Sequence, residues 1–228
     1  MPRLVLASAS PARLAVLHAA GVKPLVQVSG VDEDAVTASL APGTPPGTVV
    51  TELARAKASH VLPALREQGL HDAVVIGCDS MLLIDGVLQG KPGTVDAARE
   101  RWKTMAGRSG ELLTGHAVLR VRGDELVAQA AAHSGTVVHF GTPTDEELES
   151  YLDSGEPLQV AGAFTLDGLG GWFIEGIEGD PSSVIGIGLP LVRRLLAEVG
   201  ISVARLWAEN AAIPLDALED RSDRSPAD

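Results

Sequence analysis

One uninterrupted apolar run constrains the fold of this chain more than any other stretch. Residues 73–78 read Ala-Val-Val-Ile-Gly-Cys and carry no charged side chain. A short run of this kind is typical of a strand at the centre of a sheet, covered on both faces. The run ends at Asp79. Because ligands of open α/β sheets bind beyond the carboxyl ends of strands, we expect Asp79 at a functional site; a simple turn-initiating aspartate is the alternative.

A shorter apolar run at residues 4–6 leads through two serines into a helix. Ser10 followed by Pro11 is typical of an N-cap and the first helical residue, so we expect the helix to begin at Ser10. Its free N–H groups and positive dipole end would then face the same turn as the hydroxyl of Ser8 and the guanidinium of Arg13. This pattern predicts an anion-binding turn, and an ordinary capped strand-to-helix turn is the alternative.

Turn and capping signals divide the rest of the chain. Asp85-Gly86 predicts a tight hairpin turn, and Thr144 with Glu147 has the spacing of a capping box. We expect Trp102 in the core. The expected helices cover residues 10–20, 48–62, 94–106, 144–153 and 191–199. The expected strands cover residues 24–29, 73–79, 81–84, 87–89, 112–121, 126–140, 163–166, 171–177 and 201–206. We also expect an acidic turn at 31–34 and a loop at 42–47.

Lys57 falls on the apolar stripe of the helix expected from about residue 48. An ammonium group is costly to bury unless it is paired, so a lysine at such a position is a candidate functional residue. The alternative is a side chain that extends along its stem to reach solvent at the edge of the stripe.

The segment from Gly86 to Pro92 superficially resembles a P-loop. It has three residues between its glycines instead of four, and Pro92 stands where a serine or threonine must bind magnesium. We therefore reject a Walker A site. Lys91 remains a candidate phosphate-binding residue because of its charge.

The charge balance limits the partners of the chain. Eighteen Lys and Arg against 30 Asp and Glu give a formal charge of -12, which disfavours attraction to nucleic acid polymers and to anionic membranes. An anionic ligand must therefore be met by a local positive cluster. A single cysteine, Cys78, excludes a disulfide framework, and we expect it to be a small buried residue. With no apolar stretch of about 20 residues, we expect a cytoplasmic protein.

Taken in order, several blocks resemble the Maf family of nucleoside triphosphate pyrophosphatases from Leu4 to about Leu196. The resemblance implies an α/β fold with a mixed central sheet flanked by helices and two lobes with a cleft between them. We expect one such domain at 1–207 and a frayed acidic tail at 208–228. The matching blocks are Ser8-x-Ser10-Pro11-x-Arg13, the turn at Glu33, Lys57, Gly77-x-Asp79-Ser80-Met81, Gly90-Lys91-Pro92, Gly107-Arg108 through Thr114-Gly115, Ala161-Gly162-Ala163-Phe164, Ile177-x-Gly179-Asp180 and Leu189-Pro190.

The resemblance implies hydrolysis of a nucleoside triphosphate to the monophosphate and pyrophosphate with a divalent metal, Mg²⁺ or Mn²⁺. The residue types suit that reaction, which needs cations for the polyphosphate, hard oxygen ligands for the metal and an acceptor for the proton of water. Asp79 matches the proton acceptor proposed for the family, and its role as base or as metal ligand stays open. The candidate substrate-binding residues are Ser8, Ser10, Arg13, Lys57 and Lys91, and the candidate metal ligands are Glu33, Asp79 and Asp180.

Departures from the family pattern bear on the choice of base. Family members that hydrolyse dTTP and UTP share an arginine, a threonine and a glutamine where this chain has Ala12, Ser80 and Asp167. These differences argue against a preference for uracil or thymine. Val160 replaces a family lysine, and two extra residues follow Gly186.

Two other functions fit the sequence. The first is a nucleotide-sensing regulator of cell division, because the family is associated with septum formation; hydrolysis would then be incidental. The second is a simple phosphate or sugar-nucleotide binder, which would need no cluster of carboxylates. The resemblance is also compatible with a homodimer, although no apolar stripe requires one.

Overall fold

The computed structural model describes residues 2–123 and 125–211. The tail expected from residue 208 lies, from residue 212 onward, outside the described residues. The helices are α1 (Pro11–Ala19), α2 (Glu33–Ser39), α3 (Pro46–His60), α4 (Leu62–Glu67), α5 (Val95–Met105), α6 (Asp145–Asp153), α7 (Pro181–Ile185), α8 (Leu189–Glu198) and α9 (Val203–Ala211), with 3-10 turns at Glu156–Gln159, Ala161–Ala163 and Leu169–Phe173.

In the described ranges seven strands form one mixed sheet in the order β2-β1-β3-β5-β6-β7, and β4 pairs with β3 off this path. The three strands on the β2 side are parallel, and the remaining pairs are antiparallel. The strands are β1 (Arg3–Leu6), β2 (Leu25–Val26), β3 (Asp72–Ile84), β4 (Val87–Gln89), β5 (Ser109–Arg122), β6 (Glu125–Phe140) and β7 (Ile174–Glu178).

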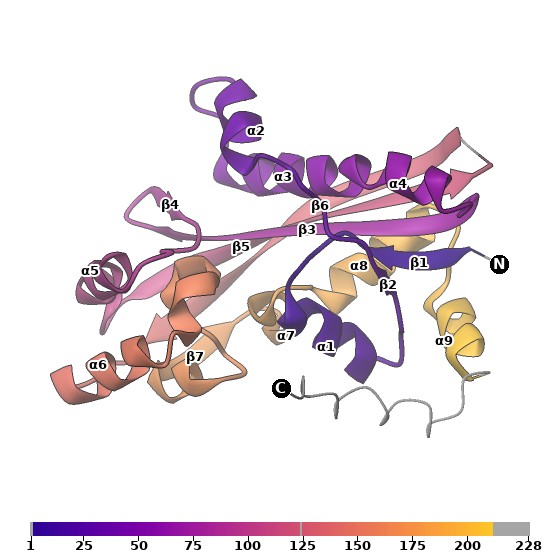
Figure 1. Ribbon diagram of the computed structural model, residues 1–228. Helices are drawn as coiled ribbons and strands as arrows, with labels where there is room; N and C mark the ends of the chain where they lie inside the picture. The colour runs from indigo at the N-terminus through magenta and orange to yellow at the C-terminus, as the bar shows by residue number, and fades with distance from the viewer. Residues whose placement is uncertain (1, 124, 212–228) are drawn as a thin grey trace, which may run out of the picture.

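Three long strands run through both lobes of the molecule (Figure 1). On one side of β3, α3 and α4 pack against Ala73 and Val75, and on the other side α1, α8 and α9 pack against Val74 and Ile76. The far ends of β3, β5 and β6 contribute to a third cluster with α5 and α6, which contains fully buried Trp102. The expected mixed α/β architecture with two lobes is confirmed, and Trp102 is a core residue.

The expected end of a strand at Asp79 is wrong, because β3 is a single strand of 13 residues from Asp72 to Ile84. Pairing with β5 from Asp72 to Leu83 carries the strand past the polar pair at Asp79 and Ser80. The parallel neighbour β1, however, pairs with β3 only as far as Ile76. Asp79 therefore lies in the middle of a long strand, just beyond the point where its neighbour on one side stops.

Three other expectations are corrected by the structure. Residues 201–206, expected as a strand, lead into helix α9, whose Leu206 packs into the core under α8. Residues 163–166 do not form a strand; they follow a 3-10 turn in which Gly162 has a φ of 70°. The acidic segment 31–34 is not a turn but the N-terminus of α2, capped by Asp32. The hairpin β3-β4 is confirmed, with positive φ at both Asp85 and Gly86.

Helix α3 approaches the sheet closely because two glycines lie beneath it. A Cβ at Gly77 would be 2.2 Å from the carbonyl oxygen of Ala54, and one at Gly115 would be 2.1 Å from that of Val50. Gly115 pairs directly with Asp79 in the antiparallel register. The missing side chains therefore let α3 rest on the backbone beside Asp79, which brings Lys57 within reach of it.

We predict that Gly115→Ala lowers the free energy of unfolding by about 3 kcal/mol, because the helix has to move away from the sheet. Displacing α3 also displaces Lys57, so activity should fall more than stability alone explains. Denaturant titration and turnover assays of the purified variant measure both effects. Gly176→Ala on β7, where the nearest atom to an added Cβ is 3.8 Å away, is the matched control and should be nearly neutral.

Candidate active site

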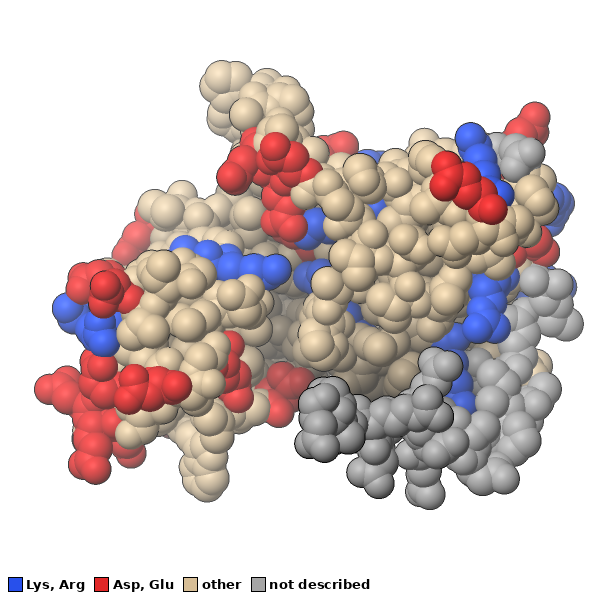
Figure 2. Space-filling view, viewed as in Figure 1, with Lys and Arg blue, Asp and Glu red and all other residues tan. Residues whose placement is uncertain are grey.

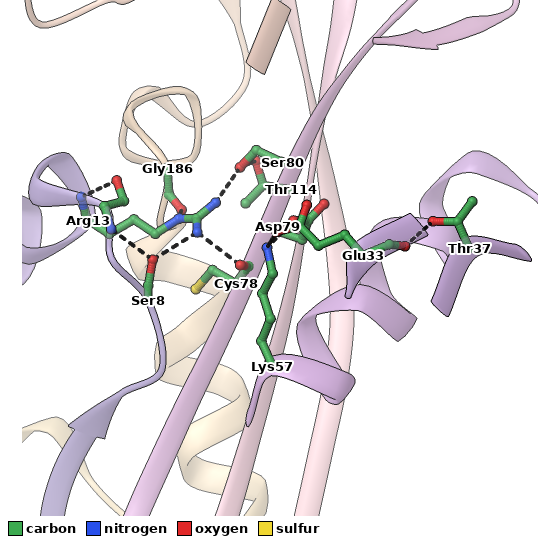
Figure 3. Close-up of polar contacts among 11 residues, drawn as sticks. Ser8, Arg13, Glu33, Thr37, Lys57, Cys78, Asp79, Ser80, Thr114 and Gly186 are labelled. Atoms are coloured by element: carbon green, nitrogen blue, oxygen red, sulfur yellow. Dashed lines mark hydrogen bonds and ion pairs between the residues drawn. The ribbon is translucent and has the colours of Figure 1, made fainter. Parts of the chain in front are cut away.

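Lys57 is held between two carboxylates. Its Nζ lies 2.6 Å from Oδ1 of Asp79 and 2.7 Å from Oε1 of Glu33 (Figure 3). The lysine side chain is only 11 % exposed, which excludes the alternative in which it extends to solvent. A buried ammonium group paired in this way carries a local positive charge in a strongly acidic chain.

Asp79 combines burial with an unsatisfied oxygen. Desolvation raises the pKa of its carboxyl above the ordinary value, although Lys57 and then Arg13 oppose the shift. Oδ2 is buried and has no hydrogen-bond partner among the described residues. Because a buried carboxylate oxygen without a donor is costly, this atom is available for a ligand, a metal ion or the proton of a water molecule.

Glu33 comes from α2, a helix without buried residues. The side chain of Asp32 accepts a hydrogen bond from the N–H of Ala35 and so caps the first turn. The sequence signal for this helix was an N-cap aspartate followed by acidic residues, which favour a helix N-terminus. No apolar periodicity accompanies it, because the helix buries almost nothing.

Arg13 is held by four oxygens at the start of α1. Its Nε donates to the carbonyl oxygen of Gly186 at 2.9 Å, and its Nη1 donates to Ser8 Oγ at 3.1 Å and to the carbonyl oxygen of Cys78 at 2.9 Å. Its Nη2 donates to Ser80 Oγ at 3.2 Å. The guanidinium therefore joins the β1-α1 turn to the free edge of β3 and to α7.

The two serines of the first turn have different roles. Ser10 is the N-cap of α1 and accepts a hydrogen bond from the N–H of Arg13, as expected. Ser8 is buried, and its hydroxyl accepts hydrogen bonds from Arg13 and from the N–H of Ser10. The turn is thus a capped helix start whose hydroxyls face a cation.

Arg13 and Lys57 approach Asp79 from opposite faces of the sheet (Figure 3). They can do so because β1 stops at Leu6 and β4 pairs with β3 only from Leu82, which leaves the edge of β3 open from Cys78 to Met81. Both cations lower the pKa of Asp79, as expected for charges close to one carboxylate. Figure 2 shows basic side chains at the hollow between the two lobes of this acidic molecule.

Two predicted site residues are not joined to this cluster. Lys91 is exposed in the loop after β4, and within the described ranges its Nζ forms no hydrogen bond or ion pair. Asp180 is the N-cap of α7, where its Oδ1 accepts hydrogen bonds from the N–H and hydroxyl of Ser182. Among the described residues no group of three potential metal ligands is assembled, so the predicted trio of Glu33, Asp79 and Asp180 is not brought together.

The donors that are present fit a magnesium-type ion held partly by substrate. Such ions bind one or two carboxylates and complete their shell with phosphate oxygens and water. Oδ2 of Asp79 has no donor, and Glu33 is 45 % exposed on its side-chain surface. These two carboxylates are therefore the residues that would hold the metal.

The sequence did not reveal how the polar side chains of β3 and β5 gather near Arg13. Ser80 Oγ lies 3.2 Å from Thr114 Oγ1, and His116 Nε2 accepts a hydrogen bond from the N–H of Gly188 at 2.9 Å. Burial, assisted by the charge of Arg13, lowers the pKa of His116 to about 3. Only the strand register reveals this group, because its members are neighbours on β3 and β5.

His116 predicts a loss of stability in acid. The folded state keeps the imidazole neutral, while the unfolded chain binds a proton below the ordinary pKa of about 6.5. Stability is therefore complete above that pH and falls as the pH decreases from about 6.5 toward about 3, by up to about 1.4 kcal/mol per pH unit. Unfolding free energies of the wild type and of His116→Gln, measured across this range, should diverge with that slope; parallel curves would contradict the assignment.

Comparison with known proteins places the geometry in context. A protein-family model described as Maf-like protein matches residues 3–199. The chain is 70 % identical over 213 residues to a nucleoside triphosphate pyrophosphatase of Rhodococcus jostii, covering 93 % of this chain and 100 % of that one. It is 67 % identical over 208 residues to a protein of the same name from Nocardia farcinica, covering 91 % and 98 %.

One solved structure, a nucleoside-triphosphatase / dITP/XTP pyrophosphatase from Mycobacterium abscessus, matches with a TM-score of 0.30 and 14 % identity over 68 % of this chain and 95 % of that one. A superposition at this level does not define a shared fold.

Proposed function

Because this chain belongs to the Maf family, we propose that it hydrolyses nucleoside triphosphates to nucleoside monophosphates and pyrophosphate. One observation carries the assignment of the site. The buried Lys57 holds Asp79 by one oxygen and leaves the other buried oxygen without a partner, beside a second cation at Arg13. A structural ion pair has no need of such an unsatisfied atom.

We assign Lys57 and Arg13 to binding of the polyphosphate. A triphosphate brings several negative charges into a protein of formal charge -12, so local positive charge is required for binding. Lys57 and Arg13 supply it on the two sides of Asp79, and the N-terminus of α1 adds N–H groups beside Ser8. We assign Ser10 to the cap of this helix, and Lys91 to a phosphate contact from the opposite loop.

Asp79 is the residue that we assign to the reacting water. Its raised pKa makes the carboxylate a better proton acceptor than an exposed aspartate. Water attacks the α-phosphorus, its proton passes to Asp79, and the bond from the α-phosphorus to the bridging oxygen breaks so that pyrophosphate leaves. Lys57 and Arg13 stabilise the charge on the phosphate oxygens.

A divalent cation, Mg²⁺ or Mn²⁺, would neutralise charge at the scissile anhydride. We assign Glu33 and Asp79 as its protein ligands and retain Asp180 as a further, separate candidate. Asp180 Oδ1 is already occupied by Ser182, which makes it the weakest of the three.

We also propose the setting in which the reaction occurs. None of the helices in the described part of the chain is long and apolar enough to span a bilayer. The acidic surface disfavours nucleic acid polymers and anionic membranes as partners, and we propose that the enzyme acts on free nucleotides in the cytoplasm. A single domain at 1–207 and a homodimer remain predictions from the family resemblance.

The first test is a product analysis on a panel of canonical and methylated nucleoside triphosphates with Mg²⁺ or Mn²⁺. We expect equal amounts of monophosphate and pyrophosphate, and release of orthophosphate without pyrophosphate would contradict the assigned bond. The same panel identifies the base, for which Ala12, Ser80 and Asp167 argue against uracil and thymine.

Asp79→Asn should reduce kcat by about 1,000-fold or more, because the amide cannot accept the proton. The variant should remain folded but lose about 3 kcal/mol of unfolding free energy, because the buried Lys57 then keeps only Glu33 as an ionised partner. Turnover assays and denaturant titration measure the two quantities. Near-normal turnover would remove Asp79 from the reaction.

Metal titration separates the candidate ligands. Glu33→Gln should raise the Mn²⁺ concentration for half-maximal activity by about tenfold, because a carboxylate oxygen is lost. Asp180→Asn keeps a side chain able to cap α7 and should leave that concentration unchanged. An equal increase in the Asp180 variant would make Asp180 a ligand in the substrate complex.

A further inference from the structure

A cavity lies in the lobe formed by α5, α6 and β7, away from the catalytic cluster. Its volume is about 530 Å³, within the range of sites for small molecules. Asp79 pairs with Gly115 on β5, and Gly115 pairs with His133 on β6. Gly141, which lines the cavity, is eight residues after His133 and directly follows β6. At 3.3 Å per residue this separation is roughly 25 Å.

Aromatic rings form much of its wall. The chain has only three Trp, one Tyr and three Phe, and Tyr151, Trp172 and Phe173 all line this cavity. Phe173 and Tyr151 pack against each other with ring centroids 5.6 Å apart, and Phe173 packs edge-on against buried Trp102 at 5.8 Å. These contacts fix the floor of the cavity.

Trp172 is different, because it is 88 % exposed. Its neighbour Leu169, also in the cavity wall, is 50 % exposed. A tryptophan in contact with water over most of its surface contributes nothing to the core, whereas an exposed aromatic face beside a cavity is typical of a binding site.

Carboxylates complete the wall: Glu146, Glu147 and Glu175. Glu147 accepts hydrogen bonds from the N–H and hydroxyl of Thr144, which hold the pKa of its carboxyl low. Within the described ranges Glu146 and Glu175 form no ion pair, while nearby Glu149 binds Arg99. Figure 2 shows acidic side chains gathered over the α6 end of this lobe.

The absence of a side chain at Gly141 leaves space for the carboxylate of Glu175. A Cβ at Gly141 would be 3.0 Å from Oε1 of Glu175 and 3.4 Å from the carbonyl oxygen of Phe173. The carboxylate of Glu175 therefore lies directly over the glycine, at the side of the aromatic floor.

From these observations we propose that this cavity binds a small organic cation with an alkylated head group, such as a quaternary ammonium ion. Aromatic faces attract the charge, alkyl groups cover the exposed ring of Trp172, and the carboxylates neutralise the ion. An inorganic cation would leave the aromatic wall in contact with water, and an anion would be repelled. The site is independent of the catalytic residues.

Choline is the probe, and 3,3-dimethyl-1-butanol, which has the same shape without the charge, is its control. The chain has three Trp, so the indole N–H signals of the intact protein can be followed by NMR, and Trp172→Leu identifies the signal of Trp172. We expect choline to shift that signal with a Kd of about 1 mM and the neutral alcohol to bind at least about tenfold more weakly. Sodium chloride at equal concentration should have no effect.

Choline binding, followed by ligand-observed NMR, should weaken about fivefold in Trp172→Leu and about threefold in Glu175→Gln. Glu125→Gln makes the same change in net charge at the opposite end of β6 and should not alter binding. All three variants should hydrolyse nucleotides at the wild-type rate. Equal binding of the neutral alcohol, equal weakening by Glu125→Gln, or no shift of the Trp172 signal would each overturn the proposal without affecting the catalytic assignment.

Discussion

The ion pair between Lys57 and Asp79 is the interaction on which the site depends. Burying either charged side chain alone would be energetically unfavourable, and each charge is compensated by the other at 2.6 Å. The pair forms only because two glycines allow α3 to lie against the backbone of the sheet. The close packing of α3 on the sheet is therefore a condition for forming the ion pair. Gly77 and Gly115 are as necessary to the site as the charged residues.

The same arrangement explains how an acidic protein can accept an acidic substrate. Two cationic side chains meet at one break in the sheet, where β1 ends and β3 continues. Arg13 binds the open edge from one face, and Lys57 reaches the adjacent carboxylate from the other. Net charge then governs which partners are repelled at long range, while the proposed function assigns binding of the anionic substrate to this local cluster.

Sequence patterns predicted the parts of this structure that rest on local physics. The cap at Ser10, the hairpin at Asp85-Gly86 and the capping box at Thr144 depend on a few neighbouring residues, and all three are present. The strands expected separately at 73–79 and 81–84 form the single strand β3, because both pair with β5, and no local signal shows that they are continuous. The start of helix α9 was predicted as a strand because, in so short a run, its apolar residues fit the spacing of a strand as well as that of a helix. The contacts of Arg13 with Ser80, and of Ser80 with Thr114, follow only from the pairing register of β3 and β5.

The continuous strands also determine how the two lobes can move. β3, β5 and β6 cross from one lobe to the other as continuous strands, so none of these three connections contains a hinge segment. Closing of the lobes therefore requires bending of the hydrogen-bonded sheet. Small displacements of one lobe relative to the other are favoured over a large rigid-body rotation. In the proposed function, substrate enters past the loops and the short helix α2, whose Glu33 is paired with Lys57, the residue that we assign to the phosphates.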